Sequence, residues 1–495
     1  MRCVTRQHGK GESSLLAKRE PHILILGGGP GGYRAAIRAA QLGGRVTLVE
    51  KDQLGGTCLN RGCIPTKVLI QAVAFLNDFQ KAHSYGIQMS KPDIDIKRMM
   101  AHKNSTVKTL VGGLERLFQQ YGIDILRGVG RLTSDSEIEV ERPGVKKNVI
   151  HGDKIILAMG SKPFPLTIPG MDLEGVMGSD QILSMESIPK SLLVVGGGYI
   201  GLEFATIYSK LGTKVILIEK LSHILPNEDE EISKLLTDHL TQSGLEVFTD
   251  TEIDQIEPSG KDQVKVSLKS SHRISGRFLE RIVEKVLVAT GRVPLIEESV
   301  LKNCGIRYSN KGIEVNDRLE TSVPGIYAVG DVVGGLLLAH VAYTEGNVAA
   351  ENAMGGSASV DYTKIPRCVY TLPEIASVGL IEKEAQNHYG GIEVGRFHFK
   401  FNSRALILGD QVGMIKVLAD PSSGEILGVH IFGPHATELI SEASAVMTLE
   451  GTIDDLTSIV HAHPTLSEAI FEATLDVRSQ AIHIPPRKKQ KGNLS

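Results

Sequence analysis

The chain has 495 residues, of which 41% are hydrophobic and 22% are charged, and its formal net charge is −3. A chain of this length and balance is expected to form about three globular domains, and its small net charge argues against a surface that binds nucleic acid along its length. No apolar run reaches the ~18 residues of a membrane span, and five scattered cysteines favour a reducing compartment in which any disulfide is catalytic.

Both ends of the chain are basic. Residues 1–20 form an N-terminal extension that lacks the apolar core of a secretory signal, and its two acidic residues, Glu12 and Glu20, weigh against a transit peptide. We therefore expect a cytoplasmic protein, with the matrix of mitochondria or plastids as the alternative if the extension is a transit peptide. Residues 485–495 predict a solvated basic tail rather than a nuclear address.

The first structured element expected is a buried parallel strand at residues 22–26, which form a short apolar run bounded by glycine. A GxGxxG turn follows, with its glycines at Gly27, Gly29 and Gly32. An alanine-rich helix is expected at about 34–42, and a second strand at 46–49 ends on Glu50. In a dinucleotide-binding unit the glycines admit a pyrophosphate to the helix N-terminus, and the acidic residue accepts hydrogen bonds from ribose hydroxyls.

Two cysteines, Cys58 and Cys63, follow this unit at the mouth of the next predicted helix. A helix N-terminus stabilises a thiolate, so the pair indicates a redox-active disulfide. The alternatives are half of a zinc site and a structural disulfide. The other cysteines are isolated, which disfavours zinc, and a core this large needs no staple, so we expect no metal site.

The same strand, turn, helix and strand recur 169 positions further on. The recurring residues are Gly196, Gly198, Gly201 and Glu219, between strands expected at 192–195 and 215–218. One such motif is weak evidence, but two with matching spacing imply two dinucleotides. Because a flavin passes electrons between thiols and a nicotinamide, we expect FAD in the first unit and a nicotinamide in the second. The carboxylate of Glu219 would repel a 2′-phosphate, which favours NAD over NADP.

The rest of the chain is expected to return to the first unit and then to build a third domain. Prolines follow Gly160, so we expect an FAD-binding part at 21–160, an NAD-binding domain at 161–289, and a return segment at 290–360. Near these boundaries Gly160, Gly330 and Asp331 are candidate FAD contacts, and Gly291 is a candidate NAD contact. An α+β domain is expected at 361–484, with strands at 397–401 and 413–417 and a helix at 436–449.

Together these features resemble the flavin-dependent disulfide oxidoreductases over about residues 21–484. The most specific segments of the likeness are 58–67, 325–331 and 461–468. The resemblance implies an α/β fold with two Rossmann-like dinucleotide-binding domains plus a C-terminal α+β dimerisation domain, in an obligate homodimer. It also implies further FAD contacts at Lys51, Thr57 and Lys67.

The resemblance assigns roles to the reactive side chains. Cys58 would be the interchange thiol that attacks substrate, and Cys63 would lie against the flavin. Lys67 and Glu203 would pair near the flavin. His463, held by Glu468, would be the acid-base group for the thiols of the other subunit. This role suits imidazole, which exchanges protons near neutral pH, backed by a carboxylate that fixes its tautomer. His461 and His340 are expected to be structural.

Within this family, the flanks Leu59-Asn60 and Ile64-Pro65 favour the branch that oxidises protein-bound dihydrolipoamide with NAD for 2-oxo acid dehydrogenase complexes, through lipoyl domains as partners. Reductases of glutathione or mercuric ion are the alternatives, as is a mainly structural flavoprotein of a larger complex. Arg61 and Leu372 differ from many relatives and leave the detailed substrate preference open.

Overall fold

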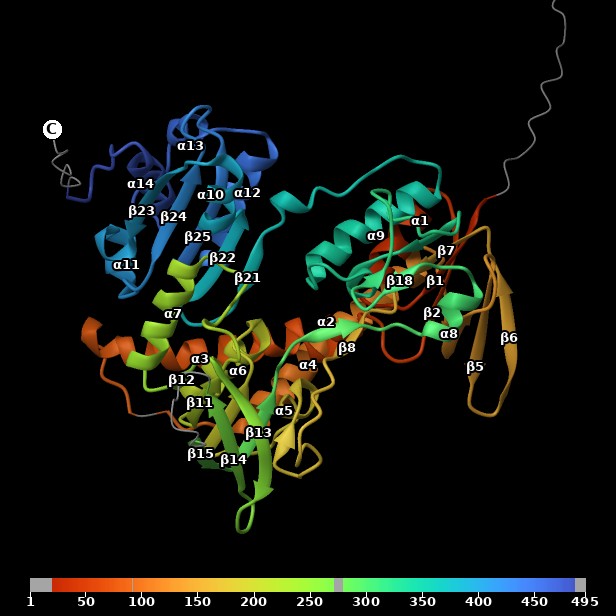
Figure 1. The fold of residues 1–495 in the computed structure, drawn as a ribbon, viewed down its shortest axis with the longest axis horizontal. Coiled ribbons are helices and arrows are strands. Elements are labelled where there is room, and N and C mark those ends of the chain that lie inside the picture. The colour runs from red at the N-terminus through yellow and green to blue at the C-terminus, as the bar shows by residue number, and fades with distance from the viewer. Residues whose placement is uncertain (1–19, 91, 271–278, 486–495) are drawn as a thin grey trace, which may run out of the picture.

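The computed structural model describes residues 20–90, 92–270 and 279–485. Most of the N-terminal extension, for which a transit peptide was the alternative, and all but one residue of the basic tail lie outside these ranges. Figure 1 shows three lobes, which we call the first unit, the second unit and the C-terminal unit. The first two are built on five-stranded parallel sheets and the third on an antiparallel one, which agrees with the α/β class that the sequence predicts.

The first unit contains a parallel sheet in the order β20-β7-β1-β2-β3. Its strands are β1 (His22–Leu26), β2 (Arg45–Glu50), β3 (Asp124–Arg127), β7 (Lys154–Leu157) and β20 (Ile326–Ala328). Its helices are α1 (Pro30–Gln41), α2 (Gly56–Arg61), α3 (Cys63–Ala82), η1 (His83–Tyr85), α4 (Ile96–Gln120), α8 (Glu298–Asn303), η2 (Gly330–Val333) and α9 (Ala339–Ala353). An antiparallel sheet of β4 (Val129–Leu132), β5 (Glu137–Arg142) and β6 (Val145–His151) extends from it, and β18 (Tyr308–Ser309) pairs with β19 (Gly312–Ile313). The apolar run at 22–26 is buried because sheet and helices cover both its faces.

The second unit repeats this plan in the order β12-β11-β10-β16-β9. Its strands are β9 (Val176–Met177), β10 (Ser191–Val195), β11 (Lys214–Ile218), β12 (Glu246–Phe248) and β16 (Lys285–Val288). Its helices are α5 (Ser179–Ile182), α6 (Tyr199–Lys210) and α7 (Glu230–Gln242). A separate antiparallel sheet joins β13 (Thr251–Pro258), β14 (Val264–Ser270) and β15 (Leu279–Val283).

Two short strands carry the chain between these units. β8 (Ser161–Pro163) leads out of the first unit, β17 (Arg292–Pro294) leads back, and the two pair antiparallel. The strand β20 then joins the first sheet beside β7, so residues beyond 290 complete a sheet begun at residue 22. The return to the first unit was expected; the exact domain boundaries stay a prediction.

The C-terminal unit is an antiparallel sheet in the order β21-β22-β25-β24-β23. Its strands are β21 (Arg367–Val369), β22 (Glu374–Gly379), β23 (Glu393–His398), β24 (Met414–Ala419) and β25 (Ile426–Gly433). Its helices are η3 (Tyr362–Lys364), α10 (Glu382–Tyr389), η4 (Phe399–Phe401), α11 (Ser403–Leu408), α12 (Ala436–Thr448), α13 (Ile453–Ser458) and α14 (Glu468–Val477).

The expected strand at 397–401 is wrong in its second half. The strand β23 ends at His398, and the alternating phenylalanines continue as the 3₁₀ turn η4. Asn402 caps the next helix through the Ala405 amide at 2.9 Å, so the chain must turn here. Phe399 remains fully buried and packs on Gly433, which satisfies the same apolar residue without a strand.

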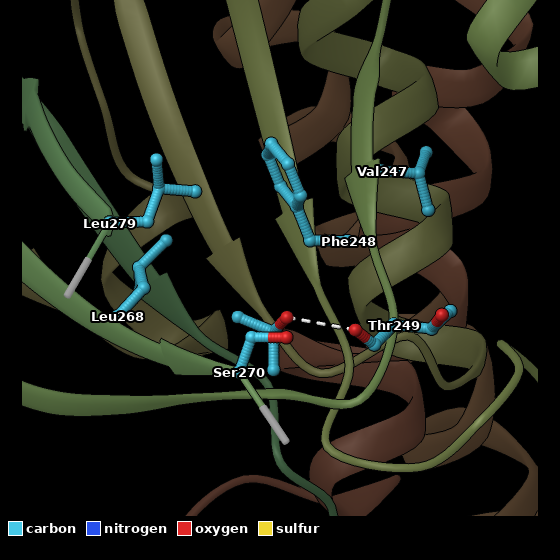
Figure 2. A pocket seen from close by; sticks show the side chains of 7 residues that line it. Val247, Phe248, Thr249, Leu268, Ser270 and Leu279 are labelled. Atoms are coloured by element: carbon cyan, nitrogen blue, oxygen red, sulfur yellow. Dashed lines mark hydrogen bonds between the residues drawn. The ribbon is translucent and has the colours of Figure 1, made fainter. Parts of the chain in front are cut away.

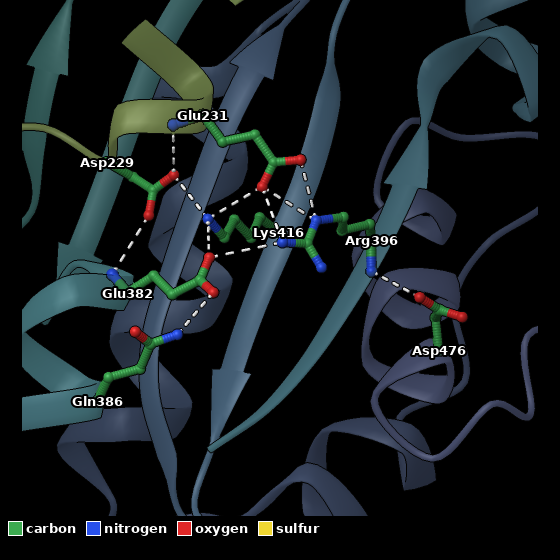
Figure 3. Close-up of polar contacts among 7 residues, drawn as sticks. All are labelled: Asp229, Glu231, Glu382, Gln386, Arg396, Lys416 and Asp476. Atoms are coloured by element: carbon green, nitrogen blue, oxygen red, sulfur yellow. Dashed lines mark hydrogen bonds and ion pairs between the residues drawn. The ribbon is translucent and has the colours of Figure 1, made fainter. Parts of the chain in front are cut away.

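A buried ion cluster joins the second unit to the C-terminal sheet (Figure 3). The side chain of Lys416, on β24, is 1% exposed. Its ammonium lies 2.7 Å from Asp229 at the start of α7, 3.0 Å from Glu231 and 2.6 Å from Glu382 on α10. A buried charge is tolerated only when it is paired in this way, so the cluster holds α7 against the sheet.

Within the described ranges, no helix combines the length and the apolar character needed to cross a membrane.

Candidate active site

The glycine turn of the first unit leaves space for a phosphate at the start of α1. Gly27 has φ +105°, and a Cβ there would lie 2.3 Å from the Ala158 carbonyl oxygen. A Cβ on Gly32 would lie 1.8 Å from the Gly27 carbonyl oxygen, so only glycine fits at both positions. The helix is capped by Gly29 without a side-chain hydrogen bond. The amides of its first turn therefore face a site suited to an anion.

The second turn has the same geometry. Gly196 has φ +108° with the Ala289 carbonyl oxygen 2.4 Å from the position of a Cβ, and a Cβ on Gly201 would lie 2.0 Å from the Gly196 carbonyl oxygen. Gly198 caps α6, again without a side-chain hydrogen bond, and has open space around it. The predicted repeat of two phosphate-accommodating turns is thus present in three dimensions.

A carboxylate closes each turn by the same pair of hydrogen bonds. Glu50 accepts from the Gly28 amide at 2.6 Å and from the Asp52 amide at 2.7 Å. In the second unit Glu219 accepts from the Gly197 amide at 2.7 Å and from the Leu221 amide at 2.8 Å. Each carboxylate keeps further lone pairs that can accept from ribose hydroxyls. Both acids are therefore fixed in place at the carboxyl ends of their strands, where a nucleotide would lie.

The two cysteines face each other across the junction of two helices. Cys58 lies in α2, Gly62 separates the helices, and Cys63 is the first residue of α3. Both are thiols in the structure, and their side chains share a hydrogen bond. That bond from Cys58 lowers the pKa of Cys63 against the opposing effect of burial, and the positive charge of Lys67 lowers it further. The same bond raises the pKa of Cys58. In the reduced pair the thiolate therefore resides on Cys63.

A partly buried ion pair lies close to the cysteines. Lys67 is one helical turn after Cys63, and its ammonium donates to both carboxylate oxygens of Glu203 on α6, at 2.7 and 2.8 Å. The Tyr370 amide donates to Glu203 at 3.2 Å, and the Tyr370 ring lies 4.4 Å from the Lys67 ammonium. The expected contact between Lys67 and Glu203 is thus observed. Because Tyr370 follows β21, all three units meet at this point.

Of the other predicted nucleotide contacts, four lie where the first and second units connect. Gly160 and Gly291 have positive φ and open space, just before β8 and β17. Asp331 accepts from the Ser161 hydroxyl at 2.5 Å, and Ser161 is held by Arg292 at 2.8 Å. The Gly330 amide instead donates to Glu345 at 2.6 Å. Thr57 is in the first turn of α2, whereas Lys51 lies exposed in the turn after β2.

His463 and Glu468 form the pair that the sequence predicts, but far from the cysteines. The His463 ring nitrogen Nδ1 lies 2.8 Å from the Glu468 carboxylate, and the His463 side chain is 72% exposed. Hydrogen bonds from the Thr465 amide and from His463 lower the pKa of Glu468, although burial opposes them. Figure 1 places α14, which begins at Glu468, at the outer end of the C-terminal unit, well away from α2. Within one chain these residues do not form one site.

The other two histidines have structural partners, as expected. His461 is 7% exposed and contacts the Glu442 carboxylate at 2.6 Å. His340 contacts the Pro366 carbonyl at 2.7 Å. Sequence reasoning missed Tyr370, Ser161 and Glu345, which contact predicted site residues. No local motif surrounds them, and their positions depend on contacts between distant segments.

A hollow in the second unit is separate from these residues (Figure 2). It has a volume of about 250 Å³ and lies between β12 and the sheet of β13, β14 and β15. Its lining includes Phe248, Leu268 and Leu279 but none of the predicted site residues. Two of the residues that line it, Ser270 and Leu279, flank residues 271–278, which lie outside the described ranges.

A thiol pair between two dinucleotide folds defines an oxidoreductase that couples thiols to a nicotinamide through a flavin. Comparison with known families agrees: residues 21–346 match the pyridine nucleotide-disulphide oxidoreductase family and residues 365–474 match its dimerisation domain. The chain belongs to this family and is an FAD-dependent oxidoreductase that uses NAD(H).

Similar proteins extend over nearly the whole chain. The dihydrolipoyl dehydrogenase of Thermus scotoductus is 43% identical over 465 residues, which cover 93% of this chain and 98% of that protein. The mitochondrial dihydrolipoyl dehydrogenase 1 of Arabidopsis thaliana is 38% identical over 468 residues, covering 94% and 92%. Among solved structures, LpdA from Mycobacterium tuberculosis superposes with a TM-score of 0.84 at 26% identity, covering 92% of this chain and 99% of that one.

The observed turns fit the two nucleotides. The close approaches at Gly27 and Gly32, and again at Gly196 and Gly201, leave the helix N-termini open to a pyrophosphate. FAD, when bound, supplies the two-electron chemistry that links thiols to the nicotinamide.

Proposed function

We propose that the protein oxidises dihydrolipoamide to lipoamide, with NAD as the electron acceptor. The observation that carries the proposal is the pair Cys58 and Cys63 at a helix junction, backed by Lys67 and Glu203, between two nucleotide turns. Dihydrolipoyl dehydrogenases that match this chain over more than nine-tenths of its length support the choice of substrate.

In the proposed reaction, the oxidised enzyme carries a disulfide between Cys58 and Cys63. A substrate thiolate attacks the Cys58 sulfur, the bond between the cysteines breaks, and Cys63 leaves as a thiolate. The second substrate thiolate then attacks the substrate sulfur of the mixed disulfide, which releases lipoamide and Cys58. The lowered pKa of Cys63 makes it the better leaving group, and Lys67 stabilises its charge.

The substrate thiols lose protons, which need an acceptor, and in the described part of one chain α14, which begins at Glu468, lies away from α2. We infer that His463 of the partner subunit takes them, with its ring oriented by the neighbouring Glu468. A two-fold dimer allows each subunit to complete the site of the other. The exposed side chain of His463, which precedes α14 at the outer end of the C-terminal unit, supports this arrangement.

We further propose that Glu219 is responsible for the choice of NAD over NADP and that the natural substrate is carried on lipoyl domains of 2-oxo acid dehydrogenase complexes. Glu219 supports NAD, since its fixed carboxylate would repel a 2′-phosphate. A cytoplasmic location also stays a proposal, because the relatives include both bacterial and mitochondrial proteins.

Turnover by the purified protein tests the proposal. We expect reduction of NAD by dihydrolipoamide, and much slower reduction of NADP under the same conditions. The competing activity, reduction of glutathione disulfide by NADPH, should be negligible. Faster turnover of glutathione disulfide would replace the proposed substrate, and a preference for NADP would overturn the role of Glu219.

Exchange of subunits tests the shared site. Cys58→Ser and His463→Gln homodimers should each be nearly inactive. After exchange, half the dimers are mixed. If His463 serves the other subunit, one site of each mixed dimer carries both substitutions and the other carries none. About a quarter of wild-type activity should therefore return. If the histidine acts within its own chain, every site retains a lesion and verified exchange restores nothing.

A further inference from the structure

An arginine and two tyrosines form a cluster that the proposed reaction does not use. Tyr33 and Arg34 lie in the first two turns of α1, and Tyr343 lies in α9. The rings of Tyr33 and Tyr343 have centroids 5.6 Å apart, and their hydroxyls share a hydrogen bond. The Arg34 guanidinium carbon lies 5.3 Å from the centroid of the Tyr343 ring. This is the distance of a cation-π contact, which holds the guanidinium in place.

Glycines bring this cluster together. A Cβ on Gly346 would lie 2.4 Å from the Gly31 carbonyl oxygen, so α1 and α9 can pack this closely only with glycine at that position. A Cβ on Gly56 would likewise lie 2.7 Å from the Gly29 Cα, which places the start of α2 against the start of α1. The arginine cluster therefore lies at the junction that also carries Cys58.

The cluster is within electrostatic range of Cys58. Burial is the main cause of the raised pKa of Tyr33, followed by its bond to Tyr343, and a charge on Cys58 adds to it. Burial and the charge of Cys58 also raise the pKa of Tyr343. Arg34 is exposed, whereas Tyr33 and Tyr343 are half-buried. The three side chains thus lead from solvent toward Cys58, whose sulfur the substrate thiolate attacks in the proposed reaction.

The charge of Arg34 is available to a ligand. Among the residues that the structure describes, no carboxylate forms an ion pair with it. Arg38, one turn further along the same helix, provides the contrast: its guanidinium donates to one Glu351 oxygen at 2.9 and 2.7 Å. Both arginines are anchored, but only the charge of Arg38 is already neutralised.

We propose that Arg34 is a specificity determinant that favours dithiol substrates carrying a carboxylate. The proposal rests on the dihydrolipoamide activity proposed above. The carboxylate comes either from the free acid, dihydrolipoate, or from an acidic side chain beside the lipoyl-lysine of a carrier protein. Arg34 makes its contact through a fixed guanidinium fork, a geometry suited to a carboxylate.

The test compares a charged substrate with its neutral amide. In Arg34→Gln, kcat/KM for dihydrolipoate should fall about threefold to fivefold relative to kcat/KM for dihydrolipoamide, as expected for one partly exposed ion pair. The change should appear in KM, with kcat retained, and should shrink as salt is added. Arg34→Lys, which keeps the charge, should preserve most of the preference. Arg38→Gln removes the same charge from the same helix and should leave the ratio unchanged.

An unchanged ratio in Arg34→Gln, or an equal change in Arg38→Gln, would overturn the proposal. Bound flavin and circular dichroism show whether each variant is folded, and Arg34→Lys keeps the test valid if the glutamine variant is not. If the wild-type protein turns over neither substrate with NAD, the proposed function fails, a result separate from any change in the ratio. Two dihydrolipoyl-lysine peptides that differ only in a flanking Asp or Asn distinguish a carrier carboxylate from that of the free acid.

Discussion

The two nucleotide units begin alike and then diverge at the same point of the fold. In both, a carboxylate after the second strand binds the glycine turn and the amide two residues on. After Glu50 the chain runs into α2 and α3, which carry Cys58 and Cys63. After Glu219 it runs to α7, whose first residues contact the C-terminal sheet. The segment after the acidic residue thus carries the two cysteines in the first unit, whereas in the second unit it contacts the C-terminal sheet.

This divergence shows which parts of the repeat are needed for a nucleotide and which parts are free. The turn and the carboxylate are retained with nearly equal distances, because a pyrophosphate and a ribose make the same demands in both units. The segment beyond them differs between the units, because α2 and α3 follow Glu50 whereas α7 follows Glu219. It can therefore serve another purpose in each unit.

The largest loss of activity is expected from a substitution in the segment of the first unit that follows Glu50 and carries Cys58. Cys58→Ser should lower dihydrolipoamide turnover by at least about a thousandfold, because the disulfide sulfur that the substrate thiolate attacks is lost. Oxidation of NADH by an artificial acceptor should persist, since neither nucleotide turn is altered. The matched control is Cys304→Ser, whose thiol lies 3.9 Å from the Leu132 carbonyl and has no part in the proposed exchange. Equal loss of both activities in Cys58→Ser would place the cysteine outside the exchange step.

Whether a contact can be predicted from the sequence depends on how far apart its residues lie along the chain. The glycine turns involve residues close in sequence, so local spacing was enough to predict them. The contact of His463 with Glu468 is also local, but it was expected from the family resemblance. The pairing of Lys67 with Glu203 spans 136 positions and could be expected only from the family resemblance.

The remaining contacts were not predictable from local patterns. The apolar alternation at 397–401 predicts a strand. The structure instead has a 3₁₀ turn after His398, because Phe399 packs on Gly433 and Asn402 caps the next helix. The partners of Lys416 lie 34 to 187 positions away in sequence, and nothing near Lys416 indicates that it is buried. Such sites follow from tertiary packing, which overrides local preference.

The next largest effect is a loss of stability when the ion cluster between α7 and the C-terminal sheet is broken (Figure 3). Lys416→Met should lower the free energy of unfolding by about 3–5 kcal/mol, because it leaves the buried carboxylate of Asp229 without its cation. Urea unfolding of the flavin-bound protein measures the change. Lys265→Met removes the partner of Glu257 at the surface and should cost far less stability than Lys416→Met, because exposed ion pairs are screened by solvent. Similar costs for the two variants would show that the buried cluster is not what holds α7.

A pH effect is expected from the first unit, because its return segment contains a buried acid whose pKa is raised by burial. Glu345 is 2% exposed, accepts from the Gly330 amide at 2.6 Å and from the Tyr362 hydroxyl at 2.7 Å, and burial raises its pKa to about 7. The native state therefore holds a proton that the unfolded state loses above its ordinary pKa of 4.5. Stability from this group is complete below pH 4.5 and is lost as the pH rises through 7.

Glu345→Gln should remove the loss of stability that the wild-type protein shows as the pH rises. The amide stays neutral and can still accept from Gly330, so the variant should gain up to about 3 kcal/mol of stability relative to wild type between pH 4.5 and pH 8. Urea midpoints at both pH values provide the measurement. Glu351→Gln on the same helix removes a carboxylate that pairs with Arg38 near the surface, and it should not produce this gain. A parallel pH dependence in Glu345→Gln and wild type would mean that Glu345 is ionised throughout the range.

The smallest effect is expected from the feature that the two units share. Glu219→Ala should narrow the preference for NAD over NADP by about tenfold, which corresponds to ~1.4 kcal/mol, because the repulsion of a 2′-phosphate is lost. The same substitution at Glu50 should weaken retention of FAD and leave the ratio of NAD to NADP unchanged, since its carboxylate belongs to the other turn. Both variants lose hydrogen bonds to two backbone amides, so they are matched in local damage. Steady-state kinetics with both nucleotides and measurement of bound flavin separate the two outcomes. If Glu50→Ala alters nucleotide choice as much as Glu219→Ala does, the two turns do not bind separate nucleotides, and the assignment of one cofactor to each unit is wrong.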